Sequence, residues 1–329
     1  MSGRGSGIRP SYKARLITTP GVRKADLVSH YLRADAAPNW SQRVKEKEGD
    51  IVKVASKPAI TITATASVLS AIELMSARRV RGLVVVGPDR RLRGTLMATD
   101  VVNYLGGGHL YNIVERRYFR DLYGALTSEI VESLMNPTPL YATVEARVTD
   151  VLKLMVLNGI GLVPVVDREG VPYGVVTEHD MVRYLHQGAL GIKVSEVMSS
   201  TLVVVYSDDT LKRAAQMMSL YGFRRVPVIS RSDNSIVGVV SAIDFIKFFG
   251  EHEALRRAES LDIEDVLSTP VESIMSKGVA TISEDSDVSE AAELMNKYNT
   301  NSLIVTSKEG EAVGILTERD VLLAYAVKR

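Results

Sequence analysis

The stretch Gly314-Ile315-Leu316-Thr317-Glu318-Arg319-Asp320 decides the fold of this chain, because it occurs in four versions. Each version has a glycine, two or three apolar residues that fit a buried strand, and an aspartate six positions after the glycine. The other versions are Gly94-Thr95-Leu96-Met97-Ala98-Thr99-Asp100, Gly174-Val175-Val176-Thr177-Glu178-His179-Asp180 and Gly238-Val239-Val240-Ser241-Ala242-Ile243-Asp244. Self-similarity of this kind indicates a repeat architecture.

The residues around each copy predict the same order of elements, which is clearest in the fourth repeat. Apolar residues recur there at helical spacing, namely Val288, Ala291, Ala292 and Met295. The predicted elements are a strand at 279–282, a helix at 287–298, strands at 302–306 and 312–316, and a closing helix at 318–325. In the other repeats we expect helices at 68–78, 148–157 and 211–221, followed by strands at 83–86, 162–166 and 226–229. The fold class is therefore α/β, built from β-α-β-β-α repeats.

The spacing of the aspartates groups the repeats into pairs. The gap from Asp180 to Asp244 is shorter than the gaps on either side, and the extra length falls at 106–129 and 250–269. A unit of about 60 residues buries too little surface to be stable alone, so we expect two modules of two repeats. Each module has a pseudo-twofold axis with a cleft on it. The expected segments are an arm at 1–50, repeats at 51–110 and 189–250, and linker helices with repeats at 111–188 and 251–329.

The composition is that of a globular protein. Of 329 residues, 46% are apolar and 24% are charged, and the formal net charge is +1. The absence of cysteine excludes disulfides and thiolate chemistry. No apolar run approaches the ~20 residues that span a bilayer, and the N-terminus resembles no secretory signal. We therefore expect a cytoplasmic protein with no membrane association.

Basic residues gather near the N-terminus. Residues 1–33 contain seven Lys or Arg and a single acid, Asp26. One interpretation is a solubilising tail or a strap across the first module. The alternative is an arm that contacts a phosphate-rich partner such as nucleic acid.

The repeated pattern resembles the CBS (cystathionine-β-synthase) domain. The features that carry the resemblance are a lead-in such as Val271-Glu272-Ser273-Ile274-Met275, a strand, a helix, an apolar strand and the Gly-x-x-Thr/Ser-x-x-Asp signature. They extend over roughly 51–328, and a pair of such repeats resembles a Bateman module. The layout is similar to that of stand-alone prokaryotic CBS proteins and of the gamma subunits of AMP-activated protein kinase. The resemblance implies a non-enzymatic regulatory protein that binds AMP, ADP, ATP or S-adenosylmethionine and reports on it to an unidentified protein partner. No further cofactor is expected.

The chemistry of the signature fits such a ligand. A carboxylate where a strand turns into a helix can accept hydrogen bonds from ribose hydroxyls, and the helix N-terminus favours a phosphate. The family implies that the residue before the aspartate faces the phosphates, and here these residues are Thr99, His179, Ile243 and Arg319. The alternative is that Thr177, Ser241 and Thr317 only cap the closing helices.

The repeats differ in which half of a site they retain. Repeats two and four keep the full signature, whereas arginines precede the second apolar strand in repeats one and three. We predict one strong site per module, because arginine–phosphate pairs are charge-assisted. The first consists of Thr177, His179 and Asp180 with Arg81 opposite, and the second of Thr317, Arg319 and Asp320 with Arg224 and Arg225 opposite. Ser241 and Asp244 form a weaker third site, and Asp100 is structural or vestigial. Alternatively, the arginines are solvated or pair with surface acids.

Two further possibilities concern partners and chemistry. The insert at 111–126 carries Arg116, Arg117 and Arg120 among aromatic residues. One interpretation is an amphipathic helix that packs on its own module or on a second subunit. The alternative is a segment that binds nucleic acid. The histidines lack metal-ligand spacing, and no nucleophile–base pair stands out. We expect no enzyme activity and no metal site. The modules are expected to form a flat disc, either within one chain or in a homodimer; a purely structural assembly module is the remaining alternative.

Overall fold

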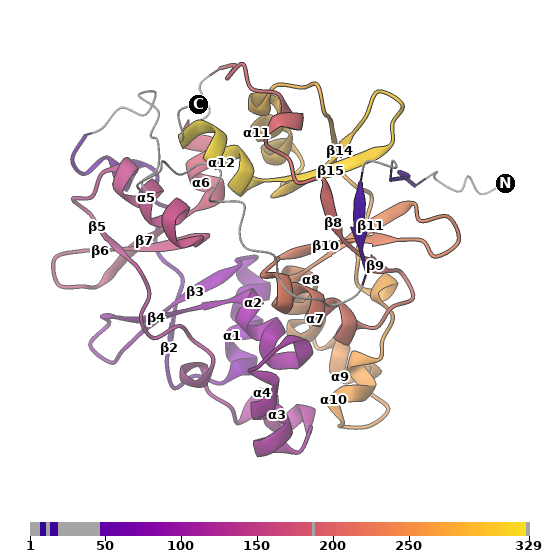
Figure 1. The fold of residues 1–329 in the computed structure, drawn as a ribbon. Coiled ribbons are helices and arrows are strands. Elements are labelled where there is room, and N and C mark those ends of the chain that lie inside the picture. The colour runs from indigo at the N-terminus through magenta and orange to yellow at the C-terminus, as the bar shows by residue number, and fades with distance from the viewer. Residues whose placement is uncertain (1–6, 11–13, 19–46, 186–187, 327–329) are drawn as a thin grey trace.

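The computed structural model describes residues 7–10, 14–18, 47–185 and 188–326. Four repeats lie around a common centre, and each has a short strand, a long helix, two paired strands and a closing helix (Figure 1). The predicted element order is therefore confirmed. Most of the predicted helices and strands agree with the observed ones to within one or two residues.

The first two repeats contain ten regular elements. Repeat 1 consists of β2 (Thr61–Thr63), α1 (Val68–Arg78), β3 (Gly82–Val86), β4 (Leu92–Met97) and α2 (Ala98–Val102), which continues into a π-helical turn (Asn103–Gly107). Two insert helices follow, α3 (Tyr111–Tyr118) and α4 (Leu122–Thr127). Repeat 2 consists of β5 (Ala142–Thr143), α5 (Val148–Asn158), β6 (Leu162–Val166), β7 (Pro172–Thr177) and α6 (Glu178–Leu185).

The second half of the chain repeats this order. Repeat 3 consists of β8 (Thr201–Val203), β9 (Val205–Tyr206), α7 (Leu211–Tyr221), β10 (Arg225–Ile229), β11 (Ile236–Ser241) and α8 (Ala242–Gly250). The second insert forms α9 (Glu253–Arg257) and α10 (Ile263–Leu267). Repeat 4 consists of β12 (Ser276–Lys277), β13 (Thr281–Ser283), α11 (Val288–Lys297), β14 (Ser302–Thr306), β15 (Ala312–Thr317) and α12 (Glu318–Ala326). Short 3₁₀ turns precede the repeats at Asp50–Lys53, Val131–Ser133, Val194–Glu196 and Val271–Ser273.

The lead-in of each repeat crosses to the sheet of its module partner. Ser56 pairs with Val175, Asn136 with Thr95, Ser199 with Ile315 and Ser276 with Val239. This crossing explains the glycine that opens every signature. A Cβ at Gly94, Gly174, Gly238 or Gly314 would lie only 2.5–2.8 Å from the carbonyl oxygen of the crossing residue, so no larger side chain fits there without a shift. The predicted pairing of repeats 1 with 2 and 3 with 4 is confirmed.

The two modules pack on one another through their helices. One apolar cluster combines helices of repeats 1 and 3, with Ile72, Met75, Phe245 and Phe249 fully buried. A second cluster combines repeats 2 and 4, including Leu152, Met181, Leu316 and Val321. Each main core is thus shared between modules, and a single chain completes the ring of four repeats (Figure 1).

Two prolines lie in central strands, although proline favours edge positions. Pro164 belongs to β6, the middle strand of its sheet, and Pro227 belongs to β10, which lies between β9 and β11. In both strands the parallel partner begins to pair one residue after the proline. At the matching position in repeat 1, Val84 donates its backbone N–H to Ile60 at 3.0 Å. The edge position that a proline in a strand indicates is therefore not the one observed, and each proline only omits this hydrogen bond.

The described part of the N-terminal arm lies on the second module. Ile8 bridges to Ile236, Pro10 bridges to Ala312, and strand β1 (Arg15–Ile17) pairs in parallel with β8. The expected strap across the first module is therefore wrong for these residues, because their backbone pairs with the second module. Ile8, Ala14 and Leu16 join a cluster formed by repeats 3 and 4, and Ile17 packs on the cluster shared by repeats 1 and 3. The rest of the predicted arm at 1–50, apart from 47–50, lies outside the described residues.

The insert helices pack on the body of the protein. Tyr111, Val114 and Leu122 are buried, and the backbone N–H of Leu122 donates to Leu261 of the second insert at 2.7 Å. Arg117 pairs with Glu129 and Arg120 pairs with Asp262. The insert thus forms helices packed on its own chain, and this contact joins the two inserts at one edge of the molecule (Figure 1).

Candidate functional site

In all four repeats the signature aspartate accepts a hydrogen bond from the backbone N–H three positions earlier. The distances are 2.7–2.9 Å for Asp100, Asp180, Asp244 and Asp320. In repeats 2 to 4 the hydroxyl of Thr177, Ser241 or Thr317 donates to the same carboxylate oxygen at 2.6–2.7 Å. Each aspartate thus holds the strand-to-helix corner with one oxygen and has a second oxygen for another partner.

The second oxygen has a serine partner in two repeats. Oδ1 of Asp180 accepts from the Ser56 hydroxyl at 3.0 Å, and Oδ1 of Asp244 accepts from the Ser276 hydroxyl at 3.5 Å. Both serines belong to lead-ins that cross from the module partner. A hydroxyl group at this oxygen marks where a ribose hydroxyl would bind, because a carboxylate oxygen accepts more than one hydrogen bond.

A continuous cleft of about 1040 Å³ contains both of these aspartates. Its walls come from all four repeats, so it spans both modules. The volume lies just above the roughly 300–1,000 Å³ range of small-molecule sites. Apolar residues such as Leu162, Val279 and Ala280 line it beside the polar groups, which gives a base-sized wall next to hydrogen-bonding groups.

The structure distributes the predicted site residues unevenly. Those that line the cleft are Arg81, Thr177, His179, Asp180, Arg224, Arg225, Ser241 and Asp244. Thr317, Arg319 and Asp320 are not among the lining residues. The cleft therefore brings the first predicted site together with the third, and it holds only the arginine half of the second.

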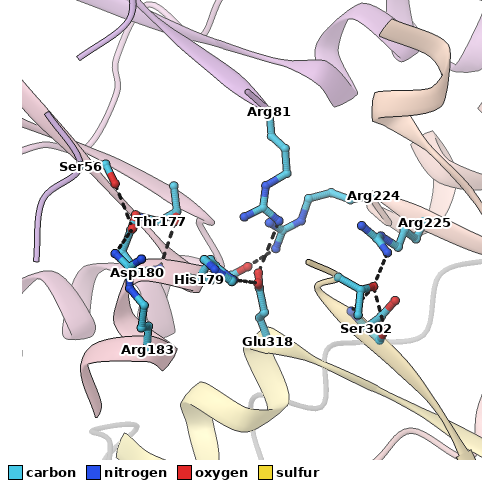
Figure 2. A network of polar contacts seen from close by, with 12 residues as sticks. Ser56, Arg81, Thr177, His179, Asp180, Arg183, Arg224, Arg225, Ser302 and Glu318 are labelled. Carbon is cyan, nitrogen blue, oxygen red and sulfur yellow. Dashed lines mark hydrogen bonds and ion pairs between the residues drawn. The ribbon is translucent and has the colours of Figure 1, made fainter. Parts of the chain in front are cut away.

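Two buried glutamates, Glu178 and Glu318, organise the charges where the two modules meet. Figure 2 shows Glu318 beside Arg81 and His179. Glu178 is fully buried and binds Arg224 and Arg319, the latter at 3.0 Å. Glu318 accepts from Nδ1 of His179 at 2.8 Å and from Arg81 at 3.4 Å. Arg81, Arg224 and Arg319, which were expected to face phosphates, are thus held by acids of the other module, and these acids are buried rather than on the surface.

The repeats match the family model of the CBS domain at residues 49–107, 131–187, 194–251 and 271–327. The chain belongs to the CBS-domain family. An uncharacterised 33.4 kDa protein from Thermofilum pendens is 33% identical over 265 residues, which cover 80% of this chain and 87% of the relative. The crystal structure of protein MJ1225 from Methanocaldococcus jannaschii, described as a candidate archaeal homologue of g-AMPK, is 26% identical. It superposes with a TM-score of 0.77 and covers 83% of this chain and 98% of that one. The CBS assignment made from the sequence is confirmed.

Arg225 differs from Arg81 and Arg224, because its hydrogen-bond partner is a hydroxyl group rather than a carboxylate. Arg225 donates to the Thr300 hydroxyl at 2.6 Å, while its Nε is buried without a hydrogen-bond partner. Burial, together with the nearby Arg81, lowers the pKa of Arg225 to about 10. A guanidinium whose charged form is disfavoured in this way would gain from an anion in the cleft.

Glu178 and Glu318 are site residues that were not predicted from the sequence. The signal was present, because the residue after the signature Thr is glutamate in repeats 2 and 4. The matching residues in repeats 1 and 3 are Ala98 and Ala242. The glutamates thus belong to repeats 2 and 4, which have no arginine before the second apolar strand. The arginines at that position belong to repeats 1 and 3, which have alanine in place of the glutamate.

Two further findings concern metal binding and membrane insertion of the described residues. Within them, no cluster of three or more His, Cys, Asp or Glu side chains is placed to hold a metal ion. None of the described helices combines the length and apolar character needed to cross a bilayer.

Proposed function

We propose that this CBS protein is a non-enzymatic sensor that binds an adenosine-containing ligand in its central cleft. The ligand classes are those implied by the resemblance: AMP, ADP, ATP or S-adenosylmethionine. The observation that carries the proposal is that Asp180 and Asp244, each beside a lead-in serine, lie in one cleft with the arginines of repeats 1 and 3. A ribose would bind at the aspartate, and its phosphate would extend toward the guanidinium groups.

The charge of the cleft favours a ligand that carries phosphate. Five basic side chains line it, namely Arg79, Arg81, Arg224, Arg225 and Lys247, against the three carboxylates of Asp180, Asp244 and Glu318. An excess of cations opposes the positively charged sulfonium of S-adenosylmethionine and attracts a phosphate. Among the implied ligands, we therefore propose a nucleotide.

Ligand binding would change the contacts between the modules. Arg81 and Arg224 now bind glutamates of the opposite module, so a phosphate group that takes either arginine competes with that glutamate. A ligand shifts a conformational equilibrium only through such differential contacts. We propose that a protein partner detects the resulting change in how the two modules pack.

The test is calorimetric titration and thermal shift with adenosine, AMP, ADP, ATP and S-adenosylmethionine. A ligand at 100 times its dissociation constant should stabilise the protein by about 2.7 kcal/mol. Asp180→Asn and Asp244→Asn keep one oxygen for the helix cap but replace the other with an NH₂ group. Each should weaken nucleotide binding at its own half of the cleft. Asp100→Asn is the matched control, since Asp100 does not line the cleft. Equal binding by all three variants, or no binding by the unmodified protein, would refute the proposal.

A further inference from the structure

Strand β1 pairs with a segment that corresponds to a wall of the open cleft. β8 (Thr201–Val203) begins two residues after the crossing Ser199, just as 278–280 begins two residues after the crossing Ser276. Residues 278–280 line the cleft that contains Asp244. The pseudo-twofold of the module therefore assigns β8 to the equivalent cleft of Asp320.

The arm is tied to this segment by its backbone. The N–H of Arg15 donates to Ser200 at 3.0 Å, and the N–H of Val204 donates to Ile17 at 2.9 Å. Leu16 lies opposite Leu202 in the parallel register. The far end is held as well, because the Arg213 guanidinium donates to the carbonyl oxygen of Thr18. Figure 1 shows β1, in indigo, beside β8.

The apolar side chains of the arm complete a cluster that continues into the open cleft. Ala14 and Leu16 pack on a core that includes Leu202, Val204 and Ile304. Ile304 also lines the cleft of Asp244. A single apolar layer thus has an open face at Asp244 and a face covered by the arm at its other end.

Asp320 has the contacts of a complete signature but does not line the open cleft. Asp320 has the same capping bonds as Asp244, with Thr317 in place of Ser241, yet it is absent from the lining of the open cleft. Burial raises the pKa of Asp320 to about 6. The complete signature of repeat 4 is therefore intact but lies outside the open cleft.

We propose that strand β1 occupies the Asp320 cleft as an intramolecular competitor, so that this nucleotide site opens only when the arm leaves β8. The inference rests on the proposed function, because it assigns to Asp320 the same class of ligand as Asp180 and Asp244. Its consequence is that the number of nucleotides bound per chain depends on the arm.

The test counts bound ATP by calorimetry in the full chain. Leu16→Asp places a charge in the apolar cluster and should release β1. Arg213→Ala removes the anchor at Thr18 without adding a charge to the cluster, which gives a second, milder release. Both variants should bind one more ATP per chain than the unmodified protein, and adding Asp320→Asn should abolish the extra binding. Arg15→Asp, at an exposed position of the same strand, should leave the number unchanged.

The outcomes separate the two proposals. If the unmodified protein binds ATP and both release variants bind the same number, the competitor role of β1 is refuted while the proposed function stands. If the extra ATP persists with Asp320→Asn, the site lies elsewhere and the assignment is wrong. If neither the unmodified protein nor any variant binds ATP, the proposed function fails and the inference fails with it.

Discussion

The four signature aspartates are alike in sequence but not in surroundings. All four cap a helix, yet only Asp180 and Asp244 line the open cleft. Burial raises the pKa of Asp100 and of Asp320 to about 6. Spacing in the sequence identifies these corners, but it cannot show which of them line the cleft, because that depends on segments distant in the chain.

Asp320 should make the stability of the protein depend on pH. Its folded-state pKa lies above the value of about 3.9 expected for an unfolded chain. The folded state therefore holds the proton more tightly, and its contribution is fully present below about pH 4 and lost as pH rises through about 6. The loss should be on the order of 2 kcal/mol by pH 7. Urea denaturation of the unmodified protein and Asp320→Asn at pH 4, 5 and 7 measures it. A constant difference between the two across this range would contradict the prediction.

Glu178→Gln should destabilise the protein more than a change at an exposed acid. Burial alone would raise the pKa of Glu178, but Arg224 and Arg319 outweigh it and hold that pKa below its usual value. Removing the charge leaves two arginines without their acid, and breaking a buried pair costs about 3–5 kcal/mol. We expect a loss of at least about 2 kcal/mol in urea denaturation, since both arginines are partly exposed. The control is Glu145→Gln, whose partner Arg168 is exposed. A loss no greater than that of the control would show that the glutamate is dispensable.

At the level of elements, local pattern was sufficient for most helices and strands. Helix α1 and strand β14 have the predicted bounds, because apolar spacing and flanking turns are local signals. Strand β1 was not predicted, since its partner β8 is nearly two hundred residues away in the chain. The crossing lead-ins were also missed as strand partners, although the signature glycines mark where they pass.

Gly174→Ala should test the close crossing of a lead-in. The added Cβ would lie 2.8 Å from the backbone oxygen of Ser56, and backbone cannot rotate away as a side chain can. Overpacking of this kind costs about 1–3 kcal/mol. Gly82→Ala is the matched control, because its added Cβ meets the side chains of Met97 and Leu162 instead of backbone. Thermal unfolding should rank the Gly174 variant below the Gly82 variant, and the reverse order would contradict this account.

For the whole molecule, the decisive feature is that one chain closes the ring of repeats. The helices that pack repeat 1 on repeat 3 and repeat 2 on repeat 4 belong to the same polypeptide. The sequence left open whether the disc forms within one chain or in a dimer, because helix periodicity does not reveal which partner covers an apolar face. The homodimer stays a prediction, but it is not needed to complete the central cleft.

Arginines from both modules line the central cleft, and this predicts how nucleotide affinity depends on the number of phosphate groups and on salt. The arginines of repeats 1 and 3 converge on one centre, so affinity should increase from adenosine through AMP to ATP. Added salt screens charge interactions, with a Debye length of about 10 Å at 0.1 M and about 3 Å at 1 M. Calorimetry at low and high salt should show a large loss of affinity for ATP and a small one for adenosine. Equal salt dependence of the two would exclude the arginines as phosphate ligands.

The exchange of lead-in segments between paired repeats has a consequence for how such a protein can arise and change. A gene duplication that copied one repeat alone would yield a sheet without the segment that crosses it, together with a segment that has no sheet to cross. Copying two consecutive repeats gives a unit in which both exchanges are satisfied. The smallest part of this chain that satisfies both exchanges is therefore the pair, and a duplication that keeps the fold has to copy both repeats together.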